Sequence, residues 1–561
     1  MKNSFTDFYA SFCYSNYQNI VEGNFQIIIN SLKDIHNIQK ALQISLFTNN
    51  WKSLSKIIQF VNMLYRKTSR YDTQLNFLEK YVNILDFEIN NPPSDNYDKF
   101  SVWIFLFGNL SNIKLNQGLR AEAYLLLKKI EYALKKVKSD PEMNDIWLLE
   151  TIATNYHNFG RYHEESRNFH KAKIAYNEAL AIRKKLMNNI GVAKLYHQFG
   201  RIEEELFNLE EAYKFYKKAI KKFEEEDAEI EKIDTLNQIA MIYHKEKKFQ
   251  NAVEWVNKSI EISNKFQLYE KIGISLNLKG NIYFEKKDFE KAERFYRISL
   301  KNFEKEGLKP RIAANYNQMG LIYMEKPQSI ELSLNWLKKS LDLSKELNDK
   351  NLIAINYRNI TQYYLKIGDL ESAEENAKKS LEINQSINSQ RNIALNYNDF
   401  GFIYFKRKQL DKAIKYYETS LEIKKNLNLN NHFPTDLFQL GRIHQENGEL
   451  EKALNYYNEV IDIYNSMDYE VGLIEPYGQI GLLYWREKKD FENAIINMAK
   501  AYNIAKRYPI KIKWQVLGNI SNLVIDIGIE KFSNLMINNL IDLPLDLIKK
   551  NIKKIKELVL P

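Results

Sequence analysis

Asp399, Phe400 and Gly401 form the triplet that binds magnesium in protein kinases. A kinase also needs a glycine-rich loop and a His-Arg-Asp catalytic loop, and the sequence contains neither. Tyr397, Phe400 and Tyr404 recur at helical spacing around Gly401, which places the triplet inside an amphipathic helix. We therefore expect Phe400 to pack, Gly401 to permit close helix contact and Asp399 to be solvated.

Other catalytic or metal-binding patterns are also incomplete. His163 precedes two glutamates but lacks the second histidine of a zinc-protease helix, and no G-x-x-x-x-G-K-[ST] phosphate loop occurs. The single cysteine, Cys13, excludes an internal disulfide and a multi-cysteine metal site, and we expect it to be a buried small side chain. The sequence predicts no catalytic residue, no metal ligand and no cofactor, and therefore no enzyme.

One sequence repeat organises most of the chain. Small residues recur at what we call the slots, which are equally spaced except for one interval near Pro327 that is longer by a single residue. The slots are Gly160, Gly200, Ala240, Gly280, Gly320, Thr361, Gly401, Gly441, Gly481 and Ser521. A second small residue follows most slots at a constant offset, at Ala172, Ala212, Ala252, Ala292, Ala373, Ala413 and Ala453, and one residue later at Ser333 and Ala494. A period held over ten units indicates a solenoid.

Each repeat contains two apolar stripes at helical spacing, separated by a turn such as "GDLESA". The stripes predict two amphipathic helices, and the small residues allow them to approach closely. One such pair cannot bury its stripe alone, so neighbouring pairs must stack. We therefore predict an all-α fold, an α-solenoid of about ten helix-turn-helix repeats.

The pattern of aromatic, Leu, Gly and Tyr in the first helix with Ala in the second resembles the tetratricopeptide repeat over residues 146–540. The spacing of the slots, as from Gly160 to Gly200, makes each repeat similar to the lengthened tetratricopeptide repeats of kinesin light chains, LGN-type polarity adaptors and bacterial peptide-sensing regulators. The resemblance implies a right-handed superhelix whose first helices line a concave groove. It identifies a fold and no particular ligand, because the motif residues are packing residues.

The remaining residues are predicted to form divergent helix pairs and a cap. We expect an N-terminal helical region at 1–100, a divergent pair at 101–145, the repeat array at 146–540 and a C-terminal capping helix at 541–561. The segments 90–96, "NNPPSDN", and 140–145, "DPEMND", are predicted breaks between helices.

The N-terminal run is similar to the region that follows the nucleotide-binding module of STAND-type NTPases. His36, Asn37, Ile38, Ala41 and Leu42 carry this similarity. The chain lacks the phosphate loop of such NTPases, so the resemblance implies a sensor-like module without its own NTPase.

Polar residues three positions before the slots form what we call the ladder. Together with arginines one position after the slots, they are the predicted partner-binding residues: His157, Arg161, His197, Arg201, Asn237, Asn277, Asn317, Arg358, Asn398 and Arg442. Stacked amides offer the donors and acceptors that clamp an extended peptide backbone. The alternative is that Asn is simply common in this sequence and tolerated on a solvated face, although its poor helix propensity counts against that.

The position after each slot, which we call the +1 row, also contains Met241, Leu321, Phe402 and Leu482, which suggest pockets for ligand side chains. At the N-terminal end, an Arg and a Glu three residues later are expected to pair within one helix. Because none of the ladder residues lies on the predicted packing stripe, we expect alanine there to change the melting temperature little.

We predict a non-catalytic adaptor or sensor that binds a peptide or protein segment in its groove, with bacterial signalling or defence as an analogy. A peptide-signal-sensing regulator that acts on a partner through its N-terminal helices is the alternative. The net charge of +10 comes from interspersed side chains, so nucleic-acid binding is the least favoured hypothesis. The sequence shows neither a secretory leader nor a long apolar run, so no membrane association and a cytoplasmic location are expected. It does not predict an oligomeric state.

Overall fold

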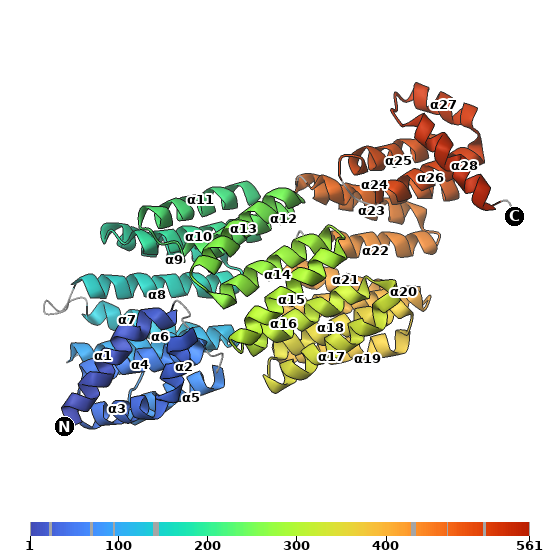
Figure 1. Cartoon of the computed structure of the whole chain (residues 1–561). Coiled ribbons are helices and arrows are strands. Elements are labelled where there is room, and N and C mark those ends of the chain that lie inside the picture. Colours follow the sequence, from blue (N-terminus) through green and yellow to red (C-terminus); the bar gives the residue numbers. More distant parts are fainter. Residues whose placement is uncertain are drawn as a thin grey trace. The chain divides into compact units, whose positions relative to one another are not determined.

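The computed structural model describes residues 2–21, 25–67, 71–93, 96–137, 145–427, 433–467, 469–508 and 512–559. These residues form helices joined by short turns and contain no strand. The chain divides into two compact units, Met1–Leu352 and Ile353–Pro561. Within each unit, successive helices pack as neighbouring pairs, as Figure 1 shows. The all-α paired-helix architecture is therefore confirmed.

The first unit begins with the helices that precede the regular repeats. These are α1 (Lys2–Val21), α2 (Phe25–Lys33), α3 (Ile35–Phe47), α4 (Trp51–Lys67), α5 (Tyr71–Ile84), α6 (Tyr97–Asn116) and α7 (Arg120–Val137). The repeats follow as α8 (Asp145–Glu165), α9 (Phe169–Lys185), α10 (Asn189–Glu205), α11 (Leu209–Glu225), α12 (Lys232–Lys245), α13 (Phe249–Lys265), α14 (Tyr269–Glu285), α15 (Phe289–Lys305), α16 (Lys309–Met324), η1 (Pro327–Ser329) and α17 (Ile330–Glu346).

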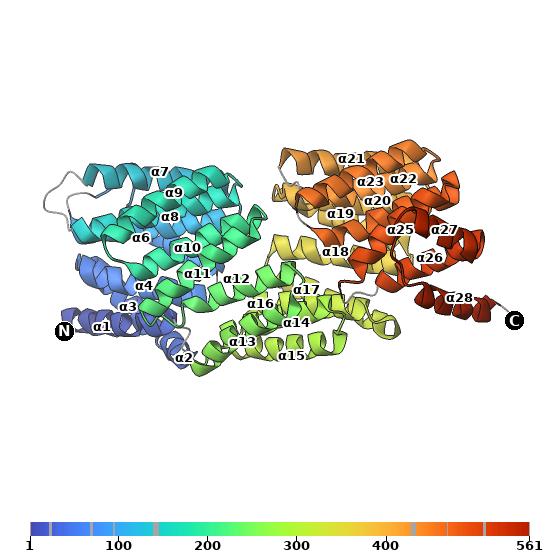
Figure 2. The same ribbon diagram turned by 90° about the horizontal axis from the view of Figure 1, so that it is seen from above.

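The second unit continues the same alternation. Its elements are α18 (Lys350–Ile367), α19 (Leu370–Ser386), α20 (Gln390–Lys406), α21 (Leu410–Asn426), α22 (Phe433–Glu446), α23 (Leu450–Ser466), η3 (Glu470–Leu473), α24 (Ile474–Leu483), η4 (Tyr484–Lys488), α25 (Phe491–Ala505), α26 (Ile512–Ile527), α27 (Ile529–Asn538) and α28 (Leu545–Val559). The boundary between the units falls in the first turn of α18. Figure 2 shows α19 to α23 of the second unit lying side by side.

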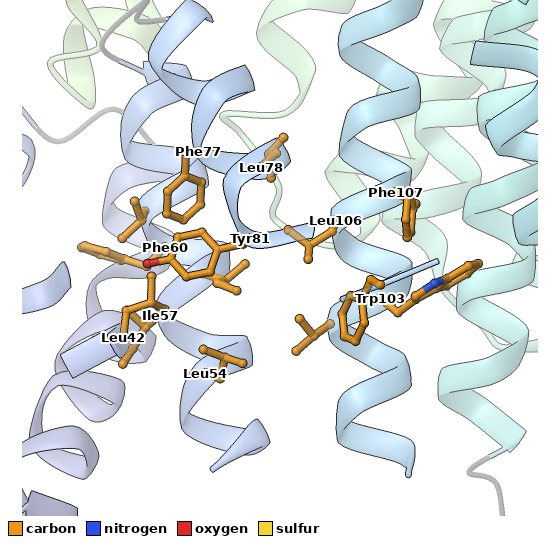
Figure 3. Packing of buried hydrophobic residues seen from close by; sticks show 14 of the residues in the cluster. Leu42, Leu54, Ile57, Phe60, Phe77, Leu78, Tyr81, Trp103, Leu106 and Phe107 are labelled. Carbon is orange, nitrogen blue, oxygen red and sulfur yellow. The ribbon is translucent and has the colours of Figure 1, made fainter. Parts of the chain in front are cut away.

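The N-terminal helices share one apolar core. Leu42 of α3, Phe60 of α4 and Tyr81 of α5 converge there, as Figure 3 shows. Trp103 of α6 is fully buried in the same core, and its indole Nε1 donates to the carbonyl of Glu88 at 3.1 Å. This bond ties the connection between α5 and α6 to the core. The divergent helix pairs predicted upstream of the repeats are therefore present.

The first predicted break, 90–96, falls between helices where the structure describes it, whereas Asp145, the last residue of the second, begins α8. Asn96 closes the 90–96 segment by accepting a hydrogen bond from the backbone N–H of Lys99, so it caps the N-terminus of α6. Residues 94 and 95 of the first predicted break and 140–144 of the second lie outside the described residues. The predicted domain boundaries stay predictions.

The slots allow each pair of helices to pack closely. A Cβ atom at Gly200 would lie 2.5 Å from the ring of Tyr216, which packs across from α11. The second small residues are also in the core, as Ala212 and Ala413 illustrate with no exposed surface. The predicted packing role of both sets is therefore confirmed.

Two one-residue insertions are absorbed without losing the register of the repeats. A 3₁₀ turn, η1, holds the extra residue near Pro327. A π-helical turn, η4, holds the one before Ala494, and Lys489 follows in a left-handed conformation with φ 56°. Single π-turns of this kind are a common way for a helix to accommodate an insertion.

Candidate functional site

The ladder lies at the junctions between successive repeats. The Nδ1 atom of His197 is 2.9 Å from the Thr235 hydroxyl, and Asn237 Nδ2 donates to the Ser275 hydroxyl at 3.0 Å. In the second unit, Asn398 Nδ2 donates to Asp436 Oδ1 at 2.6 Å. In each case the acceptor or partner is 38 residues further along, on the first helix of the next repeat. These ladder residues therefore link neighbouring repeats.

The burial of two ladder residues contradicts part of the sequence interpretation. Asn237 and Asn317 are only 6% and 4% exposed, so they lie within the packing surface that the sequence assigned to other positions. His157, His197, Asn277, Arg358 and Asn398 are partly buried. The error arose because the helical period shows which face a residue occupies, but not how closely the next repeat covers that face.

The two histidines of the ladder are neutral at pH 7. Burial lowers the pKa of His157 to about 3, and the nearby charges of Arg183 and Arg161 add to that effect. Burial likewise lowers the pKa of His197 to about 4, although Asp234 acts in the opposite direction. The positive charge at this end of the ladder is therefore carried by arginine.

Asp399 is buried, contrary to the expectation that it is solvated. It is 2% exposed, and its carboxylate accepts from Arg358 Nε at 2.8 Å and Nη2 at 3.2 Å. Gln362 Nε2 donates to the same carboxylate at 2.8 Å. Burial raises the pKa of Asp399, and Arg358 counteracts this by stabilising the ionised form. Phe400 is buried as predicted.

The three predicted arginines of the +1 row differ in their partners. Arg201 Nη2 lies 2.9 Å from Glu164 Oε1, a residue of the preceding repeat, whereas Arg161 donates to the amide oxygens of Asn112 and Asn116. The expected Arg–Glu pairing within one helix is wrong, because the helices stack closely enough for Arg201 to reach back to α8. Arg442 donates to Gln439 at 3.1 Å.

The +1 row is partly exposed in every repeat. Its residues are Arg161, Arg201, Met241, Asn281, Leu321, Gln362, Phe402, Arg442, Leu482 and Asn522. Basic, amide and apolar side chains thus occupy one equivalent and accessible position. Packing does not impose one residue type there, in contrast to the small residues at the slots.

A second polar row was missed by the sequence interpretation. Five residues before the slots, Ser275, Asn396 and Asp436 have no exposed surface. They meet serines of the second helices, as when Asn396 Nδ2 donates to the Ser380 hydroxyl at 2.9 Å. The signal was present in the sequence as serines that recur once per repeat, at Ser259, Ser299, Ser340, Ser380 and Ser420.

Among the described residues, no group of three or more His, Cys, Asp or Glu side chains could hold a metal ion. In the same part of the chain, no helix combines the length and apolar character that crossing a bilayer requires. Cys13 has no exposed surface, and burial raises the pKa of its thiol to about 12.

The comparisons with known proteins agree with the repeat architecture. One tetratricopeptide repeat model matches residues 231–305, 311–386 and 392–466, and a second matches 153–186 and 193–221, together just over half of the chain. No curated protein sequence gives a significant match.

Several solved structures are similar to the chain at low sequence identity. A Rap protein complexed with Competence and Sporulation Factor is 17% identical, with a TM-score of 0.45, over 67% of this chain and 99% of that one. The apo form of the quorum sensor NprR from B. thuringiensis is 16% identical, with a TM-score of 0.43, over 64% of this chain and 98% of that one. A STAND protein with a tetratricopeptide repeat sensor from Pyrococcus horikoshii is 16% identical, with a TM-score of 0.42, over 80% and 72%. The repeat models and the paired, stacked helices together show that the chain belongs to the tetratricopeptide repeat family.

Proposed function

We propose that this chain is a non-catalytic adaptor or sensor whose first helices recognise an extended peptide or protein segment. The observation that carries the proposal is the +1 row, which is partly exposed in every repeat and varies in chemistry. Within each unit, a repeated framework that holds different side chains at one accessible position can contact successive residues of an extended ligand. Arg161 and Arg442 supply charge, Asn281 and Gln362 supply amides, and Phe402 supplies an apolar contact.

In the proposed site, most ladder residues hold neighbouring repeats together rather than contact the ligand. Hydrogen bonds from His197, Asn237 and Asn398 to the next repeat fix how neighbouring first helices are spaced. Fixed spacing keeps the +1 side chains in register, which lowers the ordering cost of binding. Partly exposed members such as Asn277 remain proposed ligand contacts, together with His157 and Arg358.

Selection from a displayed library of random peptides tests this function with the full-length chain. We expect enriched peptides whose binding is lost in a variant that carries Met241→Ser, Leu321→Ser and Phe402→Ser. The matched control carries Lys214→Ser, Glu254→Ser and Lys415→Ser on the second helices, and it should bind like the unmodified chain. No enrichment, or equal loss in both variants, would contradict the proposal.

A second candidate function is a regulator in which the N-terminal helices act on a partner. The supporting observation is that three aromatic side chains in this region are exposed, namely Phe8 at 62%, Tyr14 at 70% and Phe47 at 83%. Aromatic side chains are enriched at protein interfaces. Replacing all three with serine should abolish regulation of the partner while peptide selection by the repeats continues. Loss of both together would count against a separate effector surface.

A further inference from the structure

A buried tyrosine hydroxyl is satisfied in the same way in three repeats. Tyr176 donates to Glu164 at 2.8 Å, and Tyr216 donates to Glu204 at 2.8 Å. In the second unit, Tyr457 donates to Gln445 at 2.9 Å. The acceptors lie one helical turn after their slots, and the tyrosines lie at a constant offset in the second helices. The acceptor therefore lies at the same position in these three repeats, whereas the equivalent Tyr296 donates to Asn281 instead.

Where the acceptor is a glutamate, the next repeat supplies a cation. Arg201 Nη2 lies 2.9 Å from Glu164 Oε1, and Lys245 Nζ lies 2.6 Å from Glu204 Oε1. The resulting arrangement is tyrosine hydroxyl, carboxylate and cation. Because each carboxylate is nearly buried, its charge must be balanced within the protein.

The repeat built on Gly401 contains the tyrosine but no acceptor. Phe405 occupies the position of Glu164 and Glu204 and is 4% exposed. Tyr417 has no exposed surface, and its hydroxyl has no hydrogen-bond partner among the described residues. The Tyr417 ring lies against Gly401, because a Cβ atom at Gly401 would be 2.8 Å from that ring. The ring of Tyr216 lies against Gly200 in the same way. The two rings thus pack against equivalent slots. Leaving a buried hydroxyl without a hydrogen-bond partner destabilises the folded protein.

The repeat that follows also supplies a cation, Arg442, but no glutamate is present at the equivalent position for it to pair with. Arg442 occupies the same +1 position as Arg201, but no carboxylate of the described residues pairs with it. Its guanidinium lies 5.2 Å from the centre of the Phe405 ring. Burial raises the pKa of Tyr417, and the charges of Asp436 and Asp399 add to that effect, whereas the charge of Arg442 acts in the opposite direction.

The carboxylates nearby are already engaged. Arg358 pairs with Asp399 at 2.8 Å, and Lys424 pairs with Asp436 at 2.5 Å. Neither of these carboxylates pairs with Arg442.

We propose that Arg442 and the Tyr417 hydroxyl form a binding point for a carboxylate that the ligand supplies in place of the missing glutamate. The proposal rests on the proposed function and specifies the chemistry of one ligand group. Arg442 is partly exposed, so its guanidinium can turn away from the Phe405 ring to meet a carboxylate of the ligand. The carboxylate accepts hydrogen bonds from the guanidinium and from the phenol, both of which are stronger when the acceptor is charged. An acidic side chain and a chain-terminal carboxylate share this chemistry.

The test uses the full-length chain labelled with ¹⁵N-arginine, in which the Arg442 Nε signal is identified by its absence in Arg442→Gln. Three probes are titrated: acetyl-trialanine with a free carboxylate, acetyl-Ala-Glu-Ala-amide and acetyl-trialanine-amide. We expect the Arg442 signal to shift with at least one acidic probe and not with the neutral one. The first probe reports a terminal carboxylate and the second an acidic side chain. No shift with either, or an equal shift with the neutral probe, would overturn the proposal.

Three variants separate this binding point from the rest of the surface. Tyr417→Phe removes only the hydroxyl and should lower the affinity for the acidic probe about three- to tenfold. Phe405→Glu supplies an internal carboxylate and should abolish the response of Arg442. Arg407→Gln is the matched control, because Arg407 lies outside the +1 row and is already neutralised by Glu374, and it should leave the response unchanged. An unchanged probe affinity in Tyr417→Phe would overturn the assignment even if Phe405→Glu fails to fold.

The library selection distinguishes failure of this inference from failure of the proposed function. If peptides that depend on the +1 row are enriched but bind Arg442→Gln as well as the unmodified chain, the chain is a binding protein and the carboxylate point is wrong. If no peptides are enriched, the proposed function itself is wrong.

Discussion

Lys424 Nζ lies 2.5 Å from Asp436 Oδ2, and the two side chains are only 3% and 0% exposed. The pair joins α21 to α22, where one repeat meets the next. One repeat earlier, the equivalent positions hold an amide pair, since Asn384 Nδ2 donates to Asn396 Oδ1 at 2.7 Å. The same junction is therefore held once by a buried ion pair and once by neutral side chains.

Breaking the buried ion pair should be costly. Lys424→Met leaves Asp436 buried without its cation, and we expect a loss of about 3–5 kcal/mol in the free energy of unfolding. The double variant Lys424→Asn and Asp436→Asn recreates the amide pair and should recover most of that loss. Denaturant unfolding followed by circular dichroism measures both. A double variant as unstable as the single one would show that the two junctions are not equivalent.

Adding a methyl group at a slot should destabilise the pair of helices around it. At Gly200 the new Cβ would lie 2.5 Å from the ring of Tyr216, so we expect Gly200→Ala to cost about 1–3 kcal/mol. Leucine at Gly320, where a Cβ already falls 2.7 Å from Leu337, should do more damage. Gly478→Ala is the control, because nothing lies within 4 Å of its Cβ, and it should leave the melting temperature unchanged or raised. Equal melting temperatures for Gly200→Ala and the unmodified chain would refute the slot assignment.

Two glutamates on second helices should contribute to acid sensitivity. Glu293 accepts from Tyr323 and pairs with Lys326 at 2.7 Å, and Glu374 pairs with Arg407 at 2.5 Å. Although burial opposes it, the net effect of the hydrogen bonds is to lower the pKa of both carboxyls from about 4.5 to about 2.

A folded-state pKa below the unfolded value stabilises the protein above about pH 4.5, and this stabilisation is lost as the pH falls towards 2. Glu293→Gln combined with Glu374→Gln should therefore lower stability at pH 7 and flatten its decline below pH 4.5. Thermal melts from pH 7 to pH 3 measure the slope. Exposed Glu331→Gln is the control, and an identical slope in all three proteins would contradict the prediction.

The ladder asparagines should differ in their effect on stability. Asn237→Ala removes one hydrogen bond to the buried Ser275 hydroxyl, so we expect a loss of about 1–2 kcal/mol. Asn277 is partly exposed and has no side-chain hydrogen-bond partner among the described residues, so Asn277→Ala should change the melting temperature little. Scanning calorimetry of the two variants compares them directly, and the prediction fails if Asn277→Ala is the less stable.

The repeated spacing was enough to predict the paired helices from the sequence. Equally spaced slots, most of them followed by an alanine at a constant offset, indicate that two helices pack closely in each repeat. A bulky residue at either place would force these helices apart. The two insertions were also visible in the numbering. The way they are absorbed, a 3₁₀ turn at Pro327–Ser329 and a π-turn at Tyr484–Lys488, depends on local packing that the sequence does not encode in a simple pattern.

The sequence by itself determined the helices, their order and the side of each helix that packs within its own repeat. Only the tertiary structure decided which polar residues face the next repeat. Asp399 shows the difference, because its partner Arg358 lies 41 residues earlier and is brought to it by stacking. Helical periodicity orients a side chain within one helix, whereas burial and pairing depend on the rotation between neighbouring repeats, to which residues throughout both repeats contribute.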